Sequence, residues 1–139
     1  MNYDPIFDKW HEECGVFGIF DHTVDVARYV YWGLFALQHR GQESAGIAVT
    51  DGHDVELKKG MGLITEAIKE LPTLPSHMGT GHVRYSTTGS NNPRNIQPLV
   101  IHYQGGQIAV AHNGNLTNAL AIRKRLEADG SIFQTTMDS

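Results

Sequence analysis

The stretch Cys14-Gly15-Val16-Phe17-Gly18-Ile19 begins with the only cysteine of the chain and continues as an apolar, β-prone run. A single cysteine forms neither an internal disulfide nor a thiolate metal cage, so its thiol serves packing or nucleophilic chemistry. We interpret the polar residues 1–13 as a propeptide. If the Glu13–Cys14 bond is cleaved, Cys14 gains a free α-amine with an unperturbed pKa of about 7.7–8.0, which can act as base for its own thiol.

The composition predicts an ordinary globular domain in a reducing, cytoplasmic setting. The 139 residues are 40% hydrophobic and 19% charged, and they carry a formal net charge of −4. This charge gives no reason to expect nucleic acid or an anionic membrane as a partner. No apolar run approaches the ~20 residues that span a bilayer, and the N-terminus has no secretion signal. The last residues, 135–139, predict no closing helix, strand or polar tail, so we expect the chain to be part of a larger protein.

The hydrophobic pattern predicts short strands interrupted by a few helices. Val26, Val30 and Leu34 recur at helical spacing, which predicts a core-packed helix. The predicted helices span 24–38, 65–71 and 116–128, and the predicted strands span 14–20, 46–50, 55–58, 79–85, 99–103 and 107–112. Short antiparallel strands that are interrupted by a few long helices favour an α+β layered fold.

The connections between these elements are also predicted. Residues 39–44 read as a loop, 60–62 as a turn, and Gly105-Gly106 as the turn of a hairpin. Thr65 is the expected cap of the second helix, and Asn115 or Thr117 of the third, which should stop at Asp129-Gly130.

Asn113 and Gly114 stand between a predicted strand and a predicted helix, in His112-Asn113-Gly114-Asn115. If Cys14 is a nucleophile, the Asn113 carboxamide and the Gly114 backbone N–H could stabilise one oxyanion together. The alternative is a plain turn, because Asn-Gly pairs are common turn residues.

Three further charged positions are candidates for substrate binding. Arg84 follows an apolar strand and could hold a carboxylate through two parallel hydrogen bonds, although a structural ion pair is the alternative. Asp138 could bind an ammonium group, or be merely solvated. Arg40-Gly41 could brace the loop near the nucleophile, whereas the alternative is an arginine that favours a helix dipole.

The 8 histidines show no metal-ligand spacing. His82 and His112 alternate with apolar residues on predicted strands, so we interpret them as hydrogen-bonded core residues and predict no metal within this chain.

These segments together resemble the class II glutamine amidotransferase domain of the amidophosphoribosyltransferase family. The resemblance covers nearly the whole chain, and it rests on the stretches Glu13–Ile19, Ala36–Gly46, Gly81–Thr87, Gln97-Pro98 and Ala111–Leu116. The motif Leu37-Gln38-His39-Arg40-Gly41-Gln42-Glu43 distinguishes this chain from the related glucosamine-6-phosphate synthases. Those enzymes also prefer Trp where this chain has Tyr85.

The resemblance implies an N-terminal-nucleophile fold, a four-layer αββα sandwich, here incomplete at the C-terminus. It implies that Cys14, exposed by removal of residues 1–13, attacks the side-chain amide of L-glutamine, with Asn113 and Gly114 as the oxyanion hole. Arg84 would bind the glutamine α-carboxylate and Asp138 its α-ammonium group. Tyr85 and the Arg40-Gly41 loop would complete the substrate site of the glutaminase domain, residues 14–139.

The resemblance also implies features of a longer enzyme. Ammonia would pass to a C-terminal phosphoribosyltransferase domain and react with 5-phosphoribosyl 1-diphosphate to give 5-phosphoribosylamine, in the first step of purine synthesis. That domain would use Mg²⁺ and could hold a [4Fe–4S] cluster, and the enzyme would be a homo-oligomer, a tetramer. The alternatives are another class II amidotransferase, such as glucosamine-6-phosphate synthase, and an uncleaved, inactive fragment that serves as an interaction module.

Overall fold

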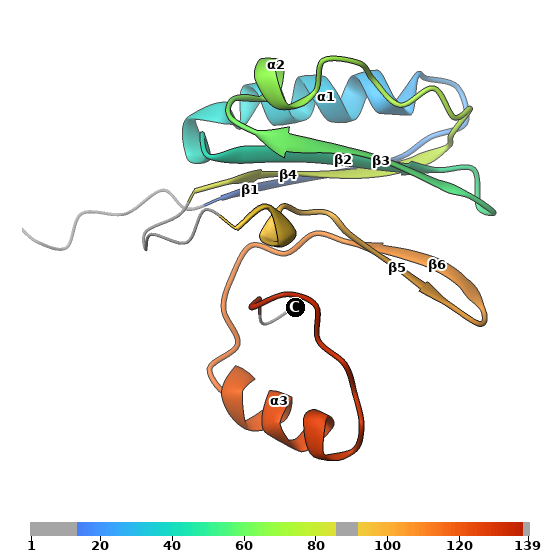
Figure 1. Ribbon diagram of the computed structural model, residues 1–139. Helices are drawn as coiled ribbons and strands as arrows, with labels where there is room; N and C mark the ends of the chain where they lie inside the picture. Colours follow the sequence, from blue (N-terminus) through green and yellow to red (C-terminus); the bar gives the residue numbers. More distant parts are fainter. Residues whose placement is uncertain (1–13, 86–91, 138–139) are drawn as a thin grey trace, which may run out of the picture.

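The computed structural model describes residues 14–85 and 92–137, which form four layers (Figure 1). The first layer is α1 (Val26–Ala36) with the short helix α2 (Ile64–Ala67). A four-stranded sheet follows, then a two-stranded sheet, and α3 (Ala119–Ala128) lies beyond the second sheet. The α+β class and the αββα layer order are therefore as predicted.

The larger sheet brings the start of the described chain beside a strand end far along the sequence. Its order is β1 (Gly15–Phe20), β4 (Met78–Arg84), β2 (Ser44–Thr50), β3 (Val55–Met61), with every pair antiparallel. Gly15 pairs with Val83, and Ser44 pairs with Arg84. This register puts Cys14 next to the residues that leave β4.

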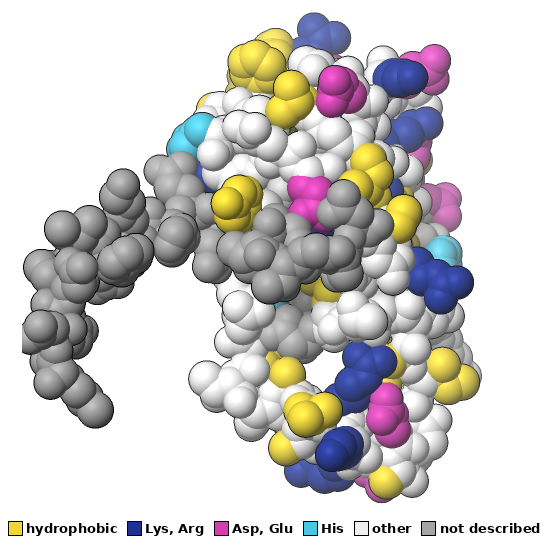
Figure 2. Space-filling model, turned by 60° about the vertical axis from the view of Figure 1, so that its left-hand side comes forward, with side chains coloured by type: hydrophobic (Ala, Val, Ile, Leu, Met, Phe, Trp, Pro, Cys, Tyr) yellow, Lys and Arg dark blue, Asp and Glu magenta, His cyan; other side chains and the backbone are white. Residues whose placement is uncertain are grey.

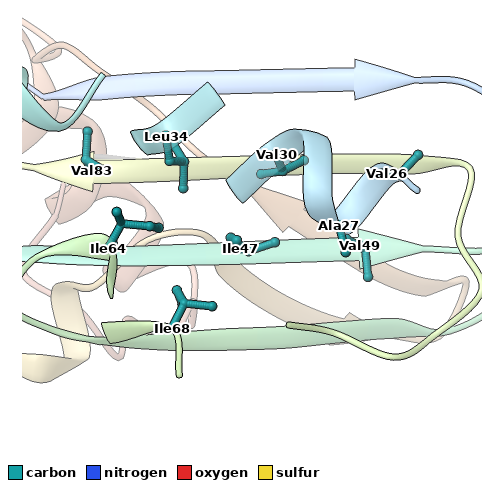
Figure 3. Close-up of a cluster of buried hydrophobic side chains, with 10 residues drawn as sticks. Val26, Ala27, Val30, Leu34, Ile47, Val49, Ile64, Ile68 and Val83 are labelled. Carbon is teal, nitrogen blue, oxygen red and sulfur yellow. The ribbon is translucent and has the colours of Figure 1, made fainter. Parts of the chain in front are cut away.

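The main core lies between α1, α2 and this sheet (Figure 3). Val26, Val30 and Leu34 are buried, as the helical spacing predicted, and they pack with Ile47 of β2. Burial of each such side chain contributes roughly 1.5–3 kcal/mol relative to exposure. The Asp25 side chain caps α1 by accepting the Arg28 N–H at 3.1 Å.

Two helical segments differ from the prediction. The loop expected at 39–44 overlaps the 3₁₀ turn η1 (Gln38–Arg40), and its last residue, Ser44, begins β2. The second helix begins at Ile64 and ends at Ala67, so Thr65 is not its cap. The reason is that side chains take over its first N–H groups: Glu66 accepts from Leu63 at 2.9 Å and Gln38 accepts from Ile64 at 2.6 Å.

Other element ends shift by a few residues. β3 continues through Met61, so the predicted turn at 60–62 is wrong, and only Gly62, with φ +93°, leaves the strand. α3 begins at Ala119 after Asn118, whose side chain makes no capping bond, rather than near residue 116. Its end at Asp129, followed by Gly130 with φ +91°, is as predicted.

The second sheet is the predicted hairpin, but its turn is Gln104-Gly105 and not Gly105-Gly106, because Gly106 already begins its second strand. It consists of β5 (Leu99–Tyr103) and β6 (Gly106–Val110), and the short 3₁₀ turn η2 (Pro93–Asn95) precedes it. β6 ends two residues before the predicted position 112. The apolar stripe of α3, with Ala119, Ile122 and Leu126, lines a cavity of about 280 Å³ together with Phe133.

Acidic and basic side chains are interspersed over the face drawn in Figure 2. Among the described residues, no helix has the length and apolar character needed to cross a membrane.

Candidate active site around Cys14

Cys14 immediately precedes β1 and is half-buried, with a positive φ of 29°. A non-glycine residue in this region is strained, and such strain is frequent at functional sites. Its sulfur lies between two backbone groups of Tyr85: the Tyr85 N–H donates at 3.4 Å, and the thiol donates to the Tyr85 carbonyl at 3.6 Å. The Tyr85 backbone thus fixes the position of the Cys14 sulfur.

The Cys14 carbonyl joins two distant segments. The Arg40 Nε donates to it at 2.9 Å from η1, and the Asn113 side-chain Nδ2 donates to it at 3.1 Å from the segment after β6. The structure thus brings together Cys14, Arg40, Tyr85 and Asn113, which lie up to 99 residues apart in the sequence.

Two glycines are required by the local geometry. A methyl group on Gly41 would lie 2.6 Å from the backbone carbon of Arg84, so only glycine lets the η1 loop approach β4 this closely. Gly114 has a φ of +153°, which side-chain-bearing residues rarely adopt. The direction of the Gly114 N–H therefore depends on a backbone conformation that glycine adopts easily.

Arg84 points away from the core residue Val83, because neighbouring residues on a strand face opposite sides. Its side chain is 16% exposed, its Nε lies 3.9 Å from a Glu43 carboxylate oxygen, and its Nη1 donates to the Asn95 carbonyl at 3.1 Å. The ion pair considered from the sequence is present, but it is long. A guanidinium has five N–H donors, so these two contacts leave capacity for a carboxylate.

Of the two remaining candidate site residues, Tyr85 is among the described residues and Asp138 is not. Tyr85 is 46% exposed and contacts Cys14 through its backbone. Asp138 lies outside the described residues, as does the expected propeptide 1–13. The substrate-binding roles of these residues therefore stay predictions.

Several buried polar side chains near the site were not assigned a role from the sequence. Asn95 binds Thr136 through both of its side-chain atoms, Nδ2 at 2.8 Å and Oδ1 at 3.3 Å, while its carbonyl accepts from Arg84. Gln97 binds the backbone of His112 twice. The one available signal was the Gln97-Pro98 pair in the resemblance, because isolated polar residues show no periodicity.

His82 is buried, as predicted, but the expectation that its ring is hydrogen-bonded is wrong. It is 1% exposed, and neither ring nitrogen has a hydrogen-bond partner among the described residues. Burial is the main cause that lowers the pKa of His82 to about 4; the backbone of His112 raises this pKa, and the positive charge of Arg84 lowers it. The ring is therefore neutral at physiological pH.

This burial predicts an acid-dependent loss of stability. Between pH 6.5 and about 4, His82 is protonated in the unfolded chain but not in the folded chain. The free energy of unfolding therefore decreases by about 3 kcal/mol as the pH is lowered through this range. Urea unfolding at pH 7 and pH 4 measures this decrease in the free energy of unfolding. The parent protein and the control His102→Gln, whose position is exposed, should both show it. A His82→Gln variant with the same acid loss as the parent would contradict this assignment.

Among the described residues, no three His, Cys, Asp or Glu side chains are grouped so that they could hold a metal ion.

The chain is similar to known proteins in both sequence and structure. Residues 39–131 match the model of the class II glutamine amidotransferases. Two curated relatives named amidophosphoribosyltransferase are each 49% identical: one from Methanocaldococcus jannaschii, over 91% of this chain and 27% of the relative, and one from Bacillus subtilis, over 93% and 28%. The chain thus spans about a quarter of the length of the curated relatives it matches.

Solved structures show the same fold. The glutamine phosphoribosylpyrophosphate amidotransferase from B. subtilis, complexed with ADP and GMP, is 48% identical with a TM-score of 0.81, over 88% of this chain and 27% of that one. A structure described as the allosteric regulatory enzyme of purine biosynthesis has a TM-score of 0.78 and 48% identity, over 86% and 26%. The N-terminal-nucleophile fold expected from the resemblance is thereby confirmed. With a family model matched over most of its length, the chain belongs to the class II glutamine amidotransferases.

Proposed function

We propose that this chain is the glutamine-hydrolysing domain of an amidophosphoribosyltransferase. The observation that carries the proposal is the convergence on Cys14: Tyr85 holds its thiol, and the candidate oxyanion donor Asn113 binds its carbonyl. The relatives with 49% identity carry the name of that enzyme, and this agrees with the proposed reaction.

In the proposed mechanism, removal of residues 1–13 frees the α-amine of Cys14. The amine accepts the thiol proton, and the sulfur attacks the carbonyl carbon of the glutamine side-chain amide. The Asn113 carboxamide and the Gly114 N–H stabilise the tetrahedral oxyanion. Its collapse breaks the C–N bond, the α-ammonium returns the proton to the leaving nitrogen, and ammonia departs. Water then hydrolyses the γ-glutamyl thioester, which gives glutamate and restores the thiol.

In the same proposal, Arg84 binds the glutamine α-carboxylate and Asp138 the α-ammonium group. Arg84 is mostly buried and held by the Asn95 carbonyl, which favours a fixed guanidinium. The Asn95 side chain also binds Thr136, so one residue contacts both Arg84 and the segment that precedes Asp138 in the sequence. Tyr85 and Gly41 would line the site beside them.

The acceptor of the ammonia is proposed to be 5-phosphoribosyl 1-diphosphate, with displacement of pyrophosphate and formation of 5-phosphoribosylamine for purine synthesis. The names of the relatives support this acceptor, and a homo-oligomeric, tetrameric enzyme in the cytoplasm is part of the proposal. The residues of this chain do not fit an iron–sulfur cluster, which is held by four cysteines, because Cys14 is its only one. Mg²⁺ and any cluster would be bound elsewhere in the enzyme.

The test is an assay of the full-length enzyme with glutamine and 5-phosphoribosyl 1-diphosphate. We expect equal amounts of glutamate and pyrophosphate to be released. The active species should have the intact mass of a chain that begins at Cys14. A mature enzyme that releases no glutamate would refute the proposed function. Glutamate release without pyrophosphate would refute only the acceptor.

Arg84→Lys tests the binding of the substrate carboxylate. A lysine ammonium is a point charge and cannot donate two parallel hydrogen bonds, so we expect the KM for glutamine to rise about tenfold or more, with a smaller change in kcat. Arg94→Lys, at an exposed position, is the matched control and should behave like the parent enzyme. An unchanged KM in Arg84→Lys would remove Arg84 from the carboxylate site.

A further inference from the structure

Gln97 is a buried polar residue to which the proposed mechanism gives no role. It is 3% exposed and lies between η2 and β5, on the side of the second sheet. Its main chain lies against β2, an inner strand of the larger sheet, because a methyl group on Gly46 would collide with the Gln97 carbonyl oxygen. The Lys59 ammonium donates to the adjacent Ile96 carbonyl at 3.0 Å and anchors the same segment. The Gln97 segment is therefore attached to two strands of the larger sheet, β2 and β3.

The Gln97 carboxamide binds both backbone groups of one residue. Its Oε1 accepts from the His112 N–H at 2.6 Å, and its Nε2 donates to the His112 carbonyl at 3.1 Å. β6 has already ended at Val110, so the side chain supplies the pair of bonds that a neighbouring strand would otherwise make. Two bonds fix the position and the rotation of the backbone, and a carboxamide of this length offers the donor and the acceptor together at every pH.

The next two residues along the chain are Asn113 and Gly114, the candidate oxyanion donors. Both are exposed and lie outside regular secondary structure, so no strand or helix ladder orients them. Oxyanion stabilisation requires donors held in advance within a few tenths of an ångström, and an error of about 1 Å can cost a hundredfold in rate. The two hydrogen bonds from Gln97 to the His112 backbone immediately precede these donors along the chain.

We propose that Gln97 is a positioning residue of the oxyanion hole: its carboxamide fixes the backbone of His112 and thereby aligns Asn113 and Gly114 with the oxygen of the tetrahedral intermediate. This inference rests on the proposed glutaminase function. Gln97 acts through His112, and its effect is on the transition state more than on the binding of glutamine.

The test is Gln97→Glu in the full-length enzyme, measured as glutamate release across pH. An ionised carboxylate accepts from the His112 N–H but cannot donate to its carbonyl, so at neutral pH kcat should fall about 10- to 100-fold with little change in KM. Burial raises the pKa of such a carboxyl, and protonation restores its donor. The ratio of variant kcat to parent kcat should therefore rise as the pH is lowered.

Two further variants separate this role from others. Gln97→Met has neither donor nor acceptor, so its kcat should be low at every pH, without recovery in acid. Gln104→Glu, at an exposed position in the turn between β5 and β6, should match the parent throughout. Alkylation of Cys14 by iodoacetamide forms no oxyanion, so its rate should be unchanged in every variant.

The outcomes are distinguishable. A parent enzyme without glutaminase activity refutes the proposed function itself. If the parent is active, the positioning role is refuted by a Gln97→Met variant with normal kcat, by a Gln97→Glu variant whose deficit is constant across pH, or by one whose change is in KM alone. A parallel loss of kcat and of Cys14 alkylation, or failure of both Gln97 variants to fold, assigns Gln97 to the fold and also overturns the proposal.

Discussion

Replacement of Cys14 by serine should reduce glutamine hydrolysis by about a thousandfold or more while glutamine still binds. A serine hydroxyl is far harder to deprotonate than a thiol near neutral pH, and oxygen is then a poor nucleophile at this position. The change replaces sulfur by a smaller atom at a half-buried residue whose carbonyl bonds to Arg40 and Asn113 do not involve the side chain. The surrounding site should therefore persist.

The measurements are steady-state glutamate release and calorimetric binding of glutamine to full-length Cys14→Ser and parent enzymes. Binding within about threefold of the parent, together with the loss of turnover, is the result that nucleophilic catalysis by Cys14 requires. Normal ammonia production by Cys14→Ser would refute the assignment. Loss of binding together with turnover would instead give Cys14 a structural role.

An enzyme that retains residues 1–13 should have at least about a hundredfold less glutaminase activity than the mature form. In the retained form, the nitrogen of Cys14 belongs to a peptide bond and cannot take up a proton. In the mature form it is an amine with a pKa of about 7.7–8.0, which can accept the thiol proton. Activity of the mature enzyme should accordingly rise with pH through that range, because the amine must be unprotonated to act as a base.

The comparison uses two forms of the full-length enzyme, identified by intact mass. One keeps the leader, and the other is produced with Cys14 directly after the initiator methionine, whose removal leaves Cys14 at the N-terminus. Equal glutamate release by both forms would exclude the α-amine as the base. Activity in the leaderless form alone would identify the amine as the required group.

The parts of the fold that followed from the sequence are those set by local patterns. The spacing of Val26, Val30 and Leu34 predicted α1, and β5 has the predicted boundaries. Two boundaries were wrong near the contact of a distant side chain. The start of α2 depends on Gln38, and β6 ends at Val110, two residues before the His112 backbone that Gln97 binds. Contacts of this kind leave no periodic trace in the sequence.

The candidate site divides in the same way. Cys14 could be singled out because it is the one thiol of the chain, and Arg84 and Asn113 because their residue types suit the chemistry. The resemblance supplied their roles. What could not be predicted was the contact between them: the Asn113 bond to the Cys14 carbonyl joins residues 99 positions apart.

The sequence by itself determined the elements of this protein, its family resemblance and the residue types available for catalysis, because these depend on neighbours within a few residues. Only the tertiary structure decided that the Tyr85 backbone holds the Cys14 thiol and that Gln97 binds His112. The physical reason is that hydrogen-bond geometry between distant segments is set by strand register and packing, which arise only when the whole sheet has formed.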